Sequence, residues 1–143
     1  MRILLTSALL AALGLFDVPA RAAERSAVIE YRQQVMRTLE AQFQAIMLIV
    51  TRDTSPENLH SHLSAALLTA RMLPRAFEPR APGGSSLPQV WTQWDDFAKH
   101  VREFEASVAI AAEAARNGTK PADVLYHIDA ISCRDCHDLY RRD

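Results

Sequence analysis

Residues 88–118 read PQVWTQWDDFAKHVREFEASVAIAAEAARNG and carry the clearest helical pattern in the chain. Apolar side chains recur there at steps of three and four, which places them on one face of a helix. They are Trp91, Trp94, Phe97, Val101, Phe104 and Val108. Pro88 suits a first helical turn, and Asn117 with Gly118 suits a C-cap. The segment predicts a long helix whose apolar face must pack against other elements.

Three more segments show the same periodicity. Residues 24–51 form the first, with Val28, Tyr31, Val35, Leu39, Phe43, Ile46 and Val50 on one face. Residues 55–72 form the second, opened by the N-cap candidate Ser55 with Pro56 and Glu57, and stopped by Pro74. The third opens at Thr119 and Pro121, and its apolar stripe leads into two cysteines near the C-terminus. The stretch 74–88 is rich in Pro, Gly and Ser and predicts a long loop.

No strand-like alternation and no internal repeat accompanies these helices. Four amphipathic helices with mostly short connections pack most simply as an antiparallel up-and-down bundle. The predicted fold is therefore all-α, a four-helix bundle. Most apolar positions are expected to be core, including Met47 and Met72 as filler of irregular gaps. Tyr31, Trp91 and Trp94 are assigned to packing.

The N-terminus resembles an export signal. Arg2 precedes an apolar run, residues 3–16, that is too short for a stable membrane anchor. Ala20 and Ala22 fit a peptidase site, so we expect residues 1–22 to be a signal peptide and 23–143 the mature domain. The expected location is the periplasm, with no membrane anchor. The formal net charge of −1 over 143 residues gives no electrostatic argument for nucleic acid as a partner.

The most specific motif is Cys133-Arg134-Asp135-Cys136-His137, which holds both cysteines of the chain. On a helix, positions i, i+3 and i+4 bring the two thiols and the imidazole to one side. The thiols can form thioethers with the two vinyl groups of a haem, and the adjacent histidine then meets the iron. The motif predicts one covalently attached haem c, bound through Cys133 and Cys136 with His137 as axial ligand.

Two other kinds of site compete for the same motif, besides a chance match. A dithiol redox motif normally follows a strand in a βαβ unit, whereas this one ends an all-helical chain. A structural zinc site needs four ligands, and the chain offers three contiguous ones with the remaining histidines scattered. Both fit less well than haem.

The chain as a whole resembles cytochrome c prime and its relatives, the class II c-type cytochromes. The resemblance covers essentially all of the expected mature chain, and only the haem motif is highly specific. The matching residues are Tyr31-Arg32-Gln33, Leu73-Pro74 with Phe77, Pro88-Gln89-Val90-Trp91, Phe97, and the cysteine motif followed by Tyr140-Arg141.

That resemblance implies roles for residues outside the motif. Arg32 and Gln33 match haem-edge contacts, with Arg32 facing a propionate, although a solvated helix arginine is the alternative. Phe77 would line the distal side, and Arg141 matches a basic residue one turn beyond the proximal histidine. A polar contact from Ser85 is a weaker match. Family members that dimerise use the first two helices, and the apolar surplus at residues 46–50 is compatible with a homodimer.

Met36 takes the distal position in this resemblance, four residues after Arg32, about one turn of 5.4 Å. In low-spin relatives a methionine there binds the iron; in five-coordinate, gas-binding relatives the position is apolar or holds a methionine that does not bind. We expect Met36 to ligate the iron. The predicted function is therefore periplasmic electron transfer with an unidentified redox partner, and the alternative is binding of nitric oxide or carbon monoxide. No enzymatic activity is expected, since a peroxidase would need a distal His or Arg pair.

Overall fold

The computed structural model describes residues 17–52, 54–129 and 131–142, which are mostly helical, with one long connection at residues 78–88, and contain no strand. In chain order the elements are α1 (Asp17–Arg52), the 3-10 helix η1 (Pro56–Asn58), α2 (Leu59–Ala70), α3 (Leu73–Phe77), α4 (Gln89–Thr92), α5 (Trp94–Arg116), α6 (Pro121–Asp129) and α7 (Cys133–Tyr140).

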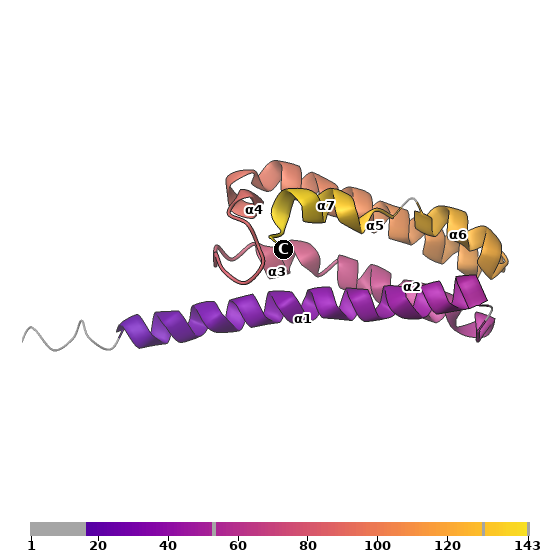
Figure 1. The fold of residues 1–143 in the computed structure, drawn as a ribbon, viewed down its shortest axis with the longest axis horizontal. Coiled ribbons are helices and arrows are strands. Elements are labelled where there is room, and N and C mark those ends of the chain that lie inside the picture. The colour runs from indigo at the N-terminus through magenta and orange to yellow at the C-terminus, as the bar shows by residue number, and fades with distance from the viewer. Residues whose placement is uncertain (1–16, 53, 130, 143) are drawn as a thin grey trace, which may run out of the picture.

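These helices make four rods (Figure 1): α1; α2 followed by α3; α4 followed by α5; and α6 followed by α7. α1 packs on α2 and α6, α5 packs on α2 and α6, and α7 lies against α4 and α5. The predicted all-α, up-and-down bundle is confirmed. α1 begins at Asp17 and projects beyond the other rods at its N-terminal end. The apolar run 3–16 lies outside the described residues, whereas Ala20 and Ala22 lie in α1. Cleavage after Ala22 stays a prediction.

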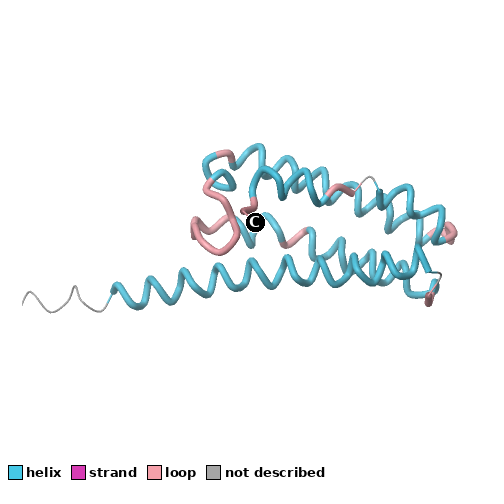
Figure 2. Tube along the Cα trace, viewed as in Figure 1, coloured by secondary structure: helices cyan, strands magenta, loops and turns pink. Residues whose placement is uncertain are grey.

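Two of the expected helices are each broken into two (Figure 2). The helix expected over 88–117 is interrupted at Gln93, whose φ of −124° and ψ of 44° are not helical. The last helix is interrupted before Ser132, since the Ser132 hydroxyl accepts a hydrogen bond from the Asp135 N–H at 3.3 Å and caps a new helix. The cysteine motif therefore opens its own helix, α7.

The second helix also differs from the prediction at both ends. Ser55 precedes η1 with a left-handed backbone, φ 52°, and its side chain makes no capping bond. α2 ends at Ala70, before Pro74, and Pro74 lies in the first turn of α3. Proline is favoured there because its missing N–H has no helical partner in a first turn. Pro74 thus begins a short helix, and the loop starts only after Phe77.

One continuous apolar core runs the length of the bundle, with Ile46, Leu63, Val108 and Val124 among its fully buried side chains. Three assignments to packing were wrong. Met47 and Met72 are 38% and 40% exposed, and Tyr31 is 53% exposed. Tyr31 and Met47 lie on the outer side of α1, which a count of apolar residues at helical spacing does not distinguish from the inner edge, and Met72 lies in the turn between α2 and α3.

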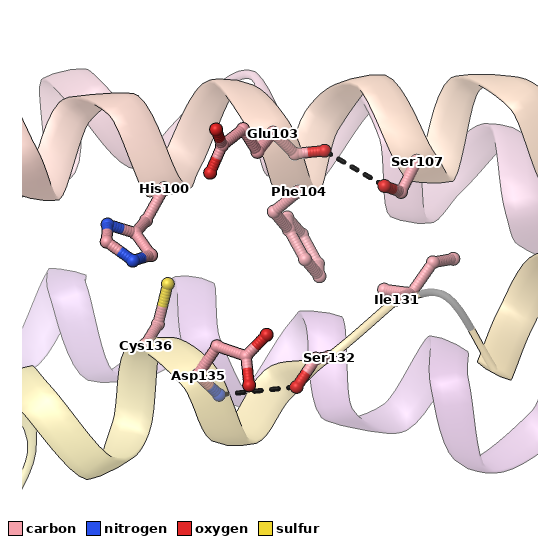
Figure 3. A pocket seen from close by; sticks show the side chains of 8 residues that line it. All are labelled: His100, Glu103, Phe104, Ser107, Ile131, Ser132, Asp135 and Cys136. Carbon is pink, nitrogen blue, oxygen red and sulfur yellow. Dashed lines mark hydrogen bonds between the residues drawn. The ribbon is translucent and has the colours of Figure 1, made fainter.

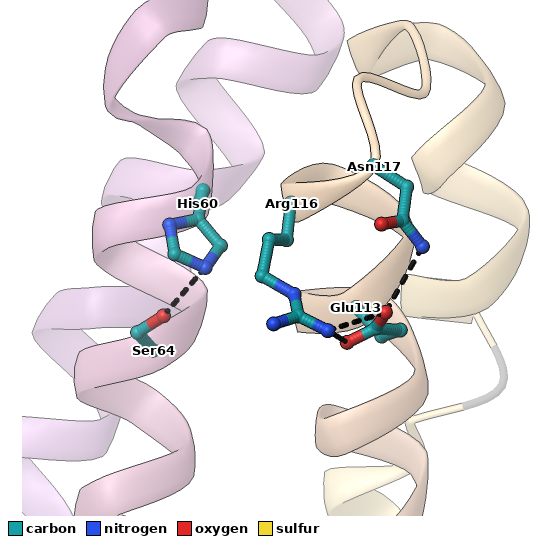
Figure 4. Close-up of polar contacts among 5 residues, drawn as sticks. All are labelled: His60, Ser64, Glu113, Arg116 and Asn117. Atoms are coloured by element: carbon teal, nitrogen blue, oxygen red, sulfur yellow. Dashed lines mark hydrogen bonds and ion pairs between the residues drawn. The ribbon is translucent and has the colours of Figure 1, made fainter.

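Polar contacts lie at the C-terminal end of α5 (Figure 4). Arg116 donates to both Glu113 oxygens, at 2.6 and 2.7 Å, and the Asn117 amide donates to Glu113 at 3.0 Å. The hydrogen bonds from Arg116, followed by the one from Asn117, lower the pKa of Glu113. Gly118 follows with φ 79°, the left-handed conformation expected of a helix C-cap. The predicted end of this helix at Asn117 and Gly118 is confirmed.

Candidate functional site

α7 presents the cysteine motif in its first two turns. Cys133 is exposed, and Cys136 and His137 are half-buried. The spacing of three and four residues on this helix brings the side chains to one side, as the sequence predicts. Both cysteines are free thiols. The motif therefore has the helical frame that attachment of a flat macrocycle needs.

The acidity of the two thiols distinguishes this motif from a dithiol redox centre. Burial raises the pKa of Cys133, and burial followed by the negative charge of Asp135 raises the pKa of Cys136 to about 11. Redox-active dithiols work through a thiolate with a lowered pKa. The thiols of this chain are protonated at neutral pH, which counts against the dithiol alternative.

The His137 imidazole is suited to bind a metal in its neutral form. Burial and then the Arg141 cation lower its pKa, while Asp138 and Glu40 act in the opposite direction. A neutral imidazole offers a nitrogen lone pair to iron. Glu40 lies on α1, one turn after Met36, so His137 is within electrostatic reach of α1 across the bundle.

A small hollow adjoins the motif between α5 and the start of α7 (Figure 3). It measures about 80 Å³, and the Cys136 sulfur points into it toward α5. Its lining residues are His100, Glu103, Phe104, Ser107, Ile131, Ser132, Asp135 and Cys136. This volume holds two or three waters, at roughly 30 Å³ each. Within the described parts of the chain, no group of three or more His, Cys, Asp or Glu side chains is placed to hold a metal ion.

Arg32 lies in the middle of α1 and is buried, with 2% of its surface exposed. Its Nη2 donates to the carbonyls of Ala81 and Gly83, each at 3.1 Å. Its guanidinium lies 5.3 Å from the ring centre of Phe77 and 5.1 Å from that of Trp91, both cation–π distances. The solvated alternative for Arg32 is wrong, because the long loop folds over it.

One donor of this buried arginine is left over. Nη1 has no hydrogen-bond partner within the described chain, and burial lowers the pKa of Arg32. An unsatisfied buried donor on a cation costs about 1–3 kcal/mol or more. A carboxylate at this position would satisfy it with a charge-assisted bond. A haem carries propionates at its edge, so the residues present fit that group.

Gln33 lies beside Arg32, under the same loop. The loop approaches α1 so closely that a Cβ on Gly84 would lie 2.8 Å from Gln33 Nε2, and one on Gly83 would lie 2.8 Å from Ile29 Cδ1. Both glycines have positive φ, 60° and 139°. Glycine is therefore required twice here, for close approach and for backbone conformation.

Of the other expected site residues, Phe77 and Met36 pack in the core, whereas Arg141 and Ser85 are exposed. Phe77 is buried, with its ring 5.1 Å from that of Phe97. Met36 is half-buried and packs against the core. Arg141 is exposed, and its N–H donates to the His137 carbonyl at 3.0 Å. Ser85 is exposed and contributes its carbonyl, which accepts from the Arg142 N–H at 2.8 Å.

Sequence reasoning missed the residues that join these parts. The Trp91 indole donates to the Phe77 carbonyl at 2.8 Å, and the Tyr140 hydroxyl donates to Asp96 at 2.6 Å. The sequence indicates a packing role for Trp91 and indicates no role for Asp96. The sequence offers one local indication that Tyr140 belongs to the site: it follows His137 by three residues, so the two side chains are neighbours on one helix.

Comparison with known proteins gives consistent matches. A family model described as Cytochrome C' matches residues 27–141. Cytochrome c' of Alcaligenes xylosoxydans is 25% identical over 117 residues, covering 80% of this chain and 92% of that protein. Cytochrome c' of Rhodospirillum rubrum is 27% identical over 150 residues, covering all of both chains.

Among solved structures, the nitric oxide complex of a leucine-to-valine variant of cytochrome c prime from Alcaligenes xylosoxidans has the same fold. Its TM-score is 0.76 at 19% identity, over 83% of this chain and 97% of that one. Since the family model spans the bundle from α1 through α7, with the cysteine motif inside the match, the chain belongs to the cytochrome c' family.

Proposed function

We propose that Cys133 and Cys136 hold the haem through thioethers, that His137 binds the iron, and that the opposite face binds a diatomic gas such as nitric oxide or carbon monoxide. Proteins of the cytochrome c' family carry covalently bound haem c with iron. The observation that carries the proposal is the placement of two protonated thiols and a neutral imidazole on one side of α7.

The residues around α7 have separate parts in this proposal. Arg32 directs its free Nη1 toward a haem propionate while its other contacts hold the loop in place. Gln33 and Arg141 would contact the haem edge, as the resemblance to the family implies. The haem iron itself supplies a redox couple and a coordination position opposite His137.

Gas binding is favoured by the apolar character of the distal side. Phe77 is part of the apolar core, and the apolar side chain of Met36 packs against that core. Apolar side chains over the iron would admit a small neutral gas and exclude strongly hydrated ligands. The solved relative described above is a nitric oxide complex, which supports the same ligand class for this chain.

Electron transfer is the second candidate, and the Met36 thioether favours it. This sulfur lies one helical turn after Arg32, on the half-buried side of α1. If it takes the sixth coordination position, the iron is low-spin, the reduction potential rises and gas binding is blocked. A redox protein would then be the partner.

The absorption spectrum of the exported protein separates the two functions. A high-spin ferrous spectrum with rapid binding of carbon monoxide supports gas binding. A low-spin spectrum in both oxidation states, with no uptake of carbon monoxide, would contradict it and support electron transfer.

Covalent attachment is tested on a denaturing gel stained for haem. A Cys133→Ala/Cys136→Ala double variant should lose the stain, and full retention would refute the attachment site.

Export and self-association complete the proposal. We expect residues 1–22 to direct the chain to the periplasm and to be removed there, which N-terminal sequencing of periplasmic protein checks. None of the helices in the described parts is long and apolar enough to cross a membrane.

Exposed apolar side chains on α1 and α2 support a homodimer through these helices; they are Met47, Leu48 and Leu68. Light scattering of the unmodified protein and of Leu68→Glu should show a dimer and a weakened dimer.

A further inference from the structure

Tyr140 is the last residue of α7 and, of the eight residues in that helix, the one that is buried. Its exposed fraction is 4%. An isolated helix of eight residues is not stable in water, so contacts with other elements must hold α7 in place. The exposed Cys133 and half-buried Cys136 and His137 supply little of that packing. Tyr140 is therefore the main anchor of the helix that carries the cysteine motif.

The Tyr140 side chain is held at both its ring and its hydroxyl by α5. Its ring meets the edge of Phe97 at a centroid distance of 5.2 Å and lies 5.9 Å from the His100 ring. Its hydroxyl donates to Asp96 Oδ2 at 2.6 Å, a charge-assisted bond across 44 positions of sequence. The Tyr140 carbonyl accepts from the Leu87 N–H at 2.8 Å, which fixes the helix end to the long loop.

Asp96 is well placed to accept this hydrogen bond. It lies in the first turn of α5, where the helix dipole favours a negative charge. Its backbone carbonyl lies 2.9 Å from His100 Nδ1, and its carboxylate 3.8 Å from the same nitrogen. The bond to Tyr140 thus joins α7 to the first turn of α5.

We propose that the Tyr140–Asp96 hydrogen bond positions α7, with the haem it carries, against α5 and so sets the separation of the haem from Met36 and Arg32 on α1. This inference rests on haem attachment at Cys133 and Cys136. Both thioethers and the axial histidine would come from α7, so the haem moves with that helix. Since α7 packs against α4 and α5, loosening its anchor lets haem and helix shift relative to α1. Tyr140 and Asp96 are positioning residues, because neither needs to touch the iron.

The experiment uses the haem-loaded protein with Tyr140→Phe, which removes the hydrogen bond, and with Asp96→Asn, which removes the charge of its acceptor; both keep the side-chain shapes. We expect amide hydrogen exchange in α7 to accelerate about tenfold, the factor for 1.4 kcal/mol. We also expect the infrared band of bound carbon monoxide to broaden or split, and its association rate to change several-fold, because the distal space is no longer uniform. Tyr126→Phe and Asp95→Asn are matched controls. Tyr126 is 79% exposed on α6, and Asp95 is the exposed neighbour of Asp96.

Each outcome decides the inference. Faster α7 exchange with an unchanged carbon monoxide band and association rate would make the bond structural only and overturn the positioning role. Unchanged exchange would show that the bond does not anchor α7 and would overturn it as well. If the bond acts as one unit, the double variant should equal Tyr140→Phe alone. Absence of gel-stable haem in the unmodified protein would refute the proposed function instead, and is seen before any variant is made.

Discussion

A fully buried arginine on a mainly apolar helix face requires compensation, because an unpaired cation is costly to remove from water. Arg32 obtains part of it from two loop carbonyls and two aromatic rings, and Nη1 remains free. The same side chain thus holds the long loop onto α1 and keeps one donor for an anion. The proposed contact with a haem propionate depends on both.

Replacing Arg32 with alanine should therefore destabilise the haem-loaded protein by about 2–4 kcal/mol, because the loop carbonyls lose their donor and two rings lose the cation above them. Urea unfolding followed by circular dichroism measures the loss. Arg37→Ala is the matched control, since Arg37 is exposed on the same helix and should change the unfolding free energy by less than about 0.5 kcal/mol. Equal losses for the two variants would contradict the role of Arg32.

Met36→Leu tests the distal ligand. The substitution nearly conserves volume, so the unfolding free energy should change by less than about 1.5 kcal/mol. If the Met36 sulfur binds iron in the unmodified protein, the variant becomes high-spin and gains rapid binding of carbon monoxide. If gas binding is the native function, the spectrum and the rate stay nearly unchanged. Stopped-flow absorption of both proteins gives the answer, and an altered spectrum would refute the open distal site.

At the scale of elements, the loop between α3 and α4 connects the parts of the site. It lies on α1 through Gly83 and Gly84, covers Arg32, and bonds to the end of α7 through Ser85 and Leu87. A contact this close leaves no room for a Cβ. The loop is therefore an ordered part of the site, although its composition alone predicts only an irregular connection.

Gly84→Ala should destabilise the protein more than Gly118→Ala. Both glycines have positive φ, 60° and 79°, which costs an alanine about 1–2 kcal/mol. A Cβ on Gly84 also meets Gln33 Nε2 at 2.8 Å and Ile29 Cγ2 at 3.1 Å, whereas one on Gly118 meets nothing within 4 Å. The difference between the two unfolding midpoints in urea thus isolates the contact with α1. Equal midpoints would show that the loop yields freely.

The four rods of the bundle could be predicted from the sequence because helical periodicity is local. The interruptions at Gln93 and before Ser132 could not, since the apolar pattern continues across both. The cysteine motif was likewise readable at once from its spacing. The burial of Arg32 and the bond from Tyr140 to Asp96 depend on residues 44 to 51 positions apart that only the folded chain brings together.

At the scale of the whole molecule, Tyr140 predicts a loss of stability in alkali. Burial, followed by the bond to Asp96 and its charge, raises the Tyr140 pKa to about 12, from the usual value of about 10. The folded state thus favours the neutral phenol. Its contribution is complete below about pH 10 and is lost as the pH rises toward 12. Unfolding free energy should fall more steeply over this window in the unmodified protein than in Tyr140→Phe. Parallel pH profiles would contradict the shift.

The chain has two tryptophans, and both lie where the long loop re-enters the bundle. The Trp91 indole is buried, hydrogen-bonded to the Phe77 carbonyl and covered by the Arg32 guanidinium. Intrinsic fluorescence from this protein therefore reports on one end of the bundle rather than on the average of the chain. A haem attached at α7 lies near enough to quench that emission by energy transfer. The fluorescence of freshly synthesised protein thus provides a label-free optical measure of how much of it has received its cofactor.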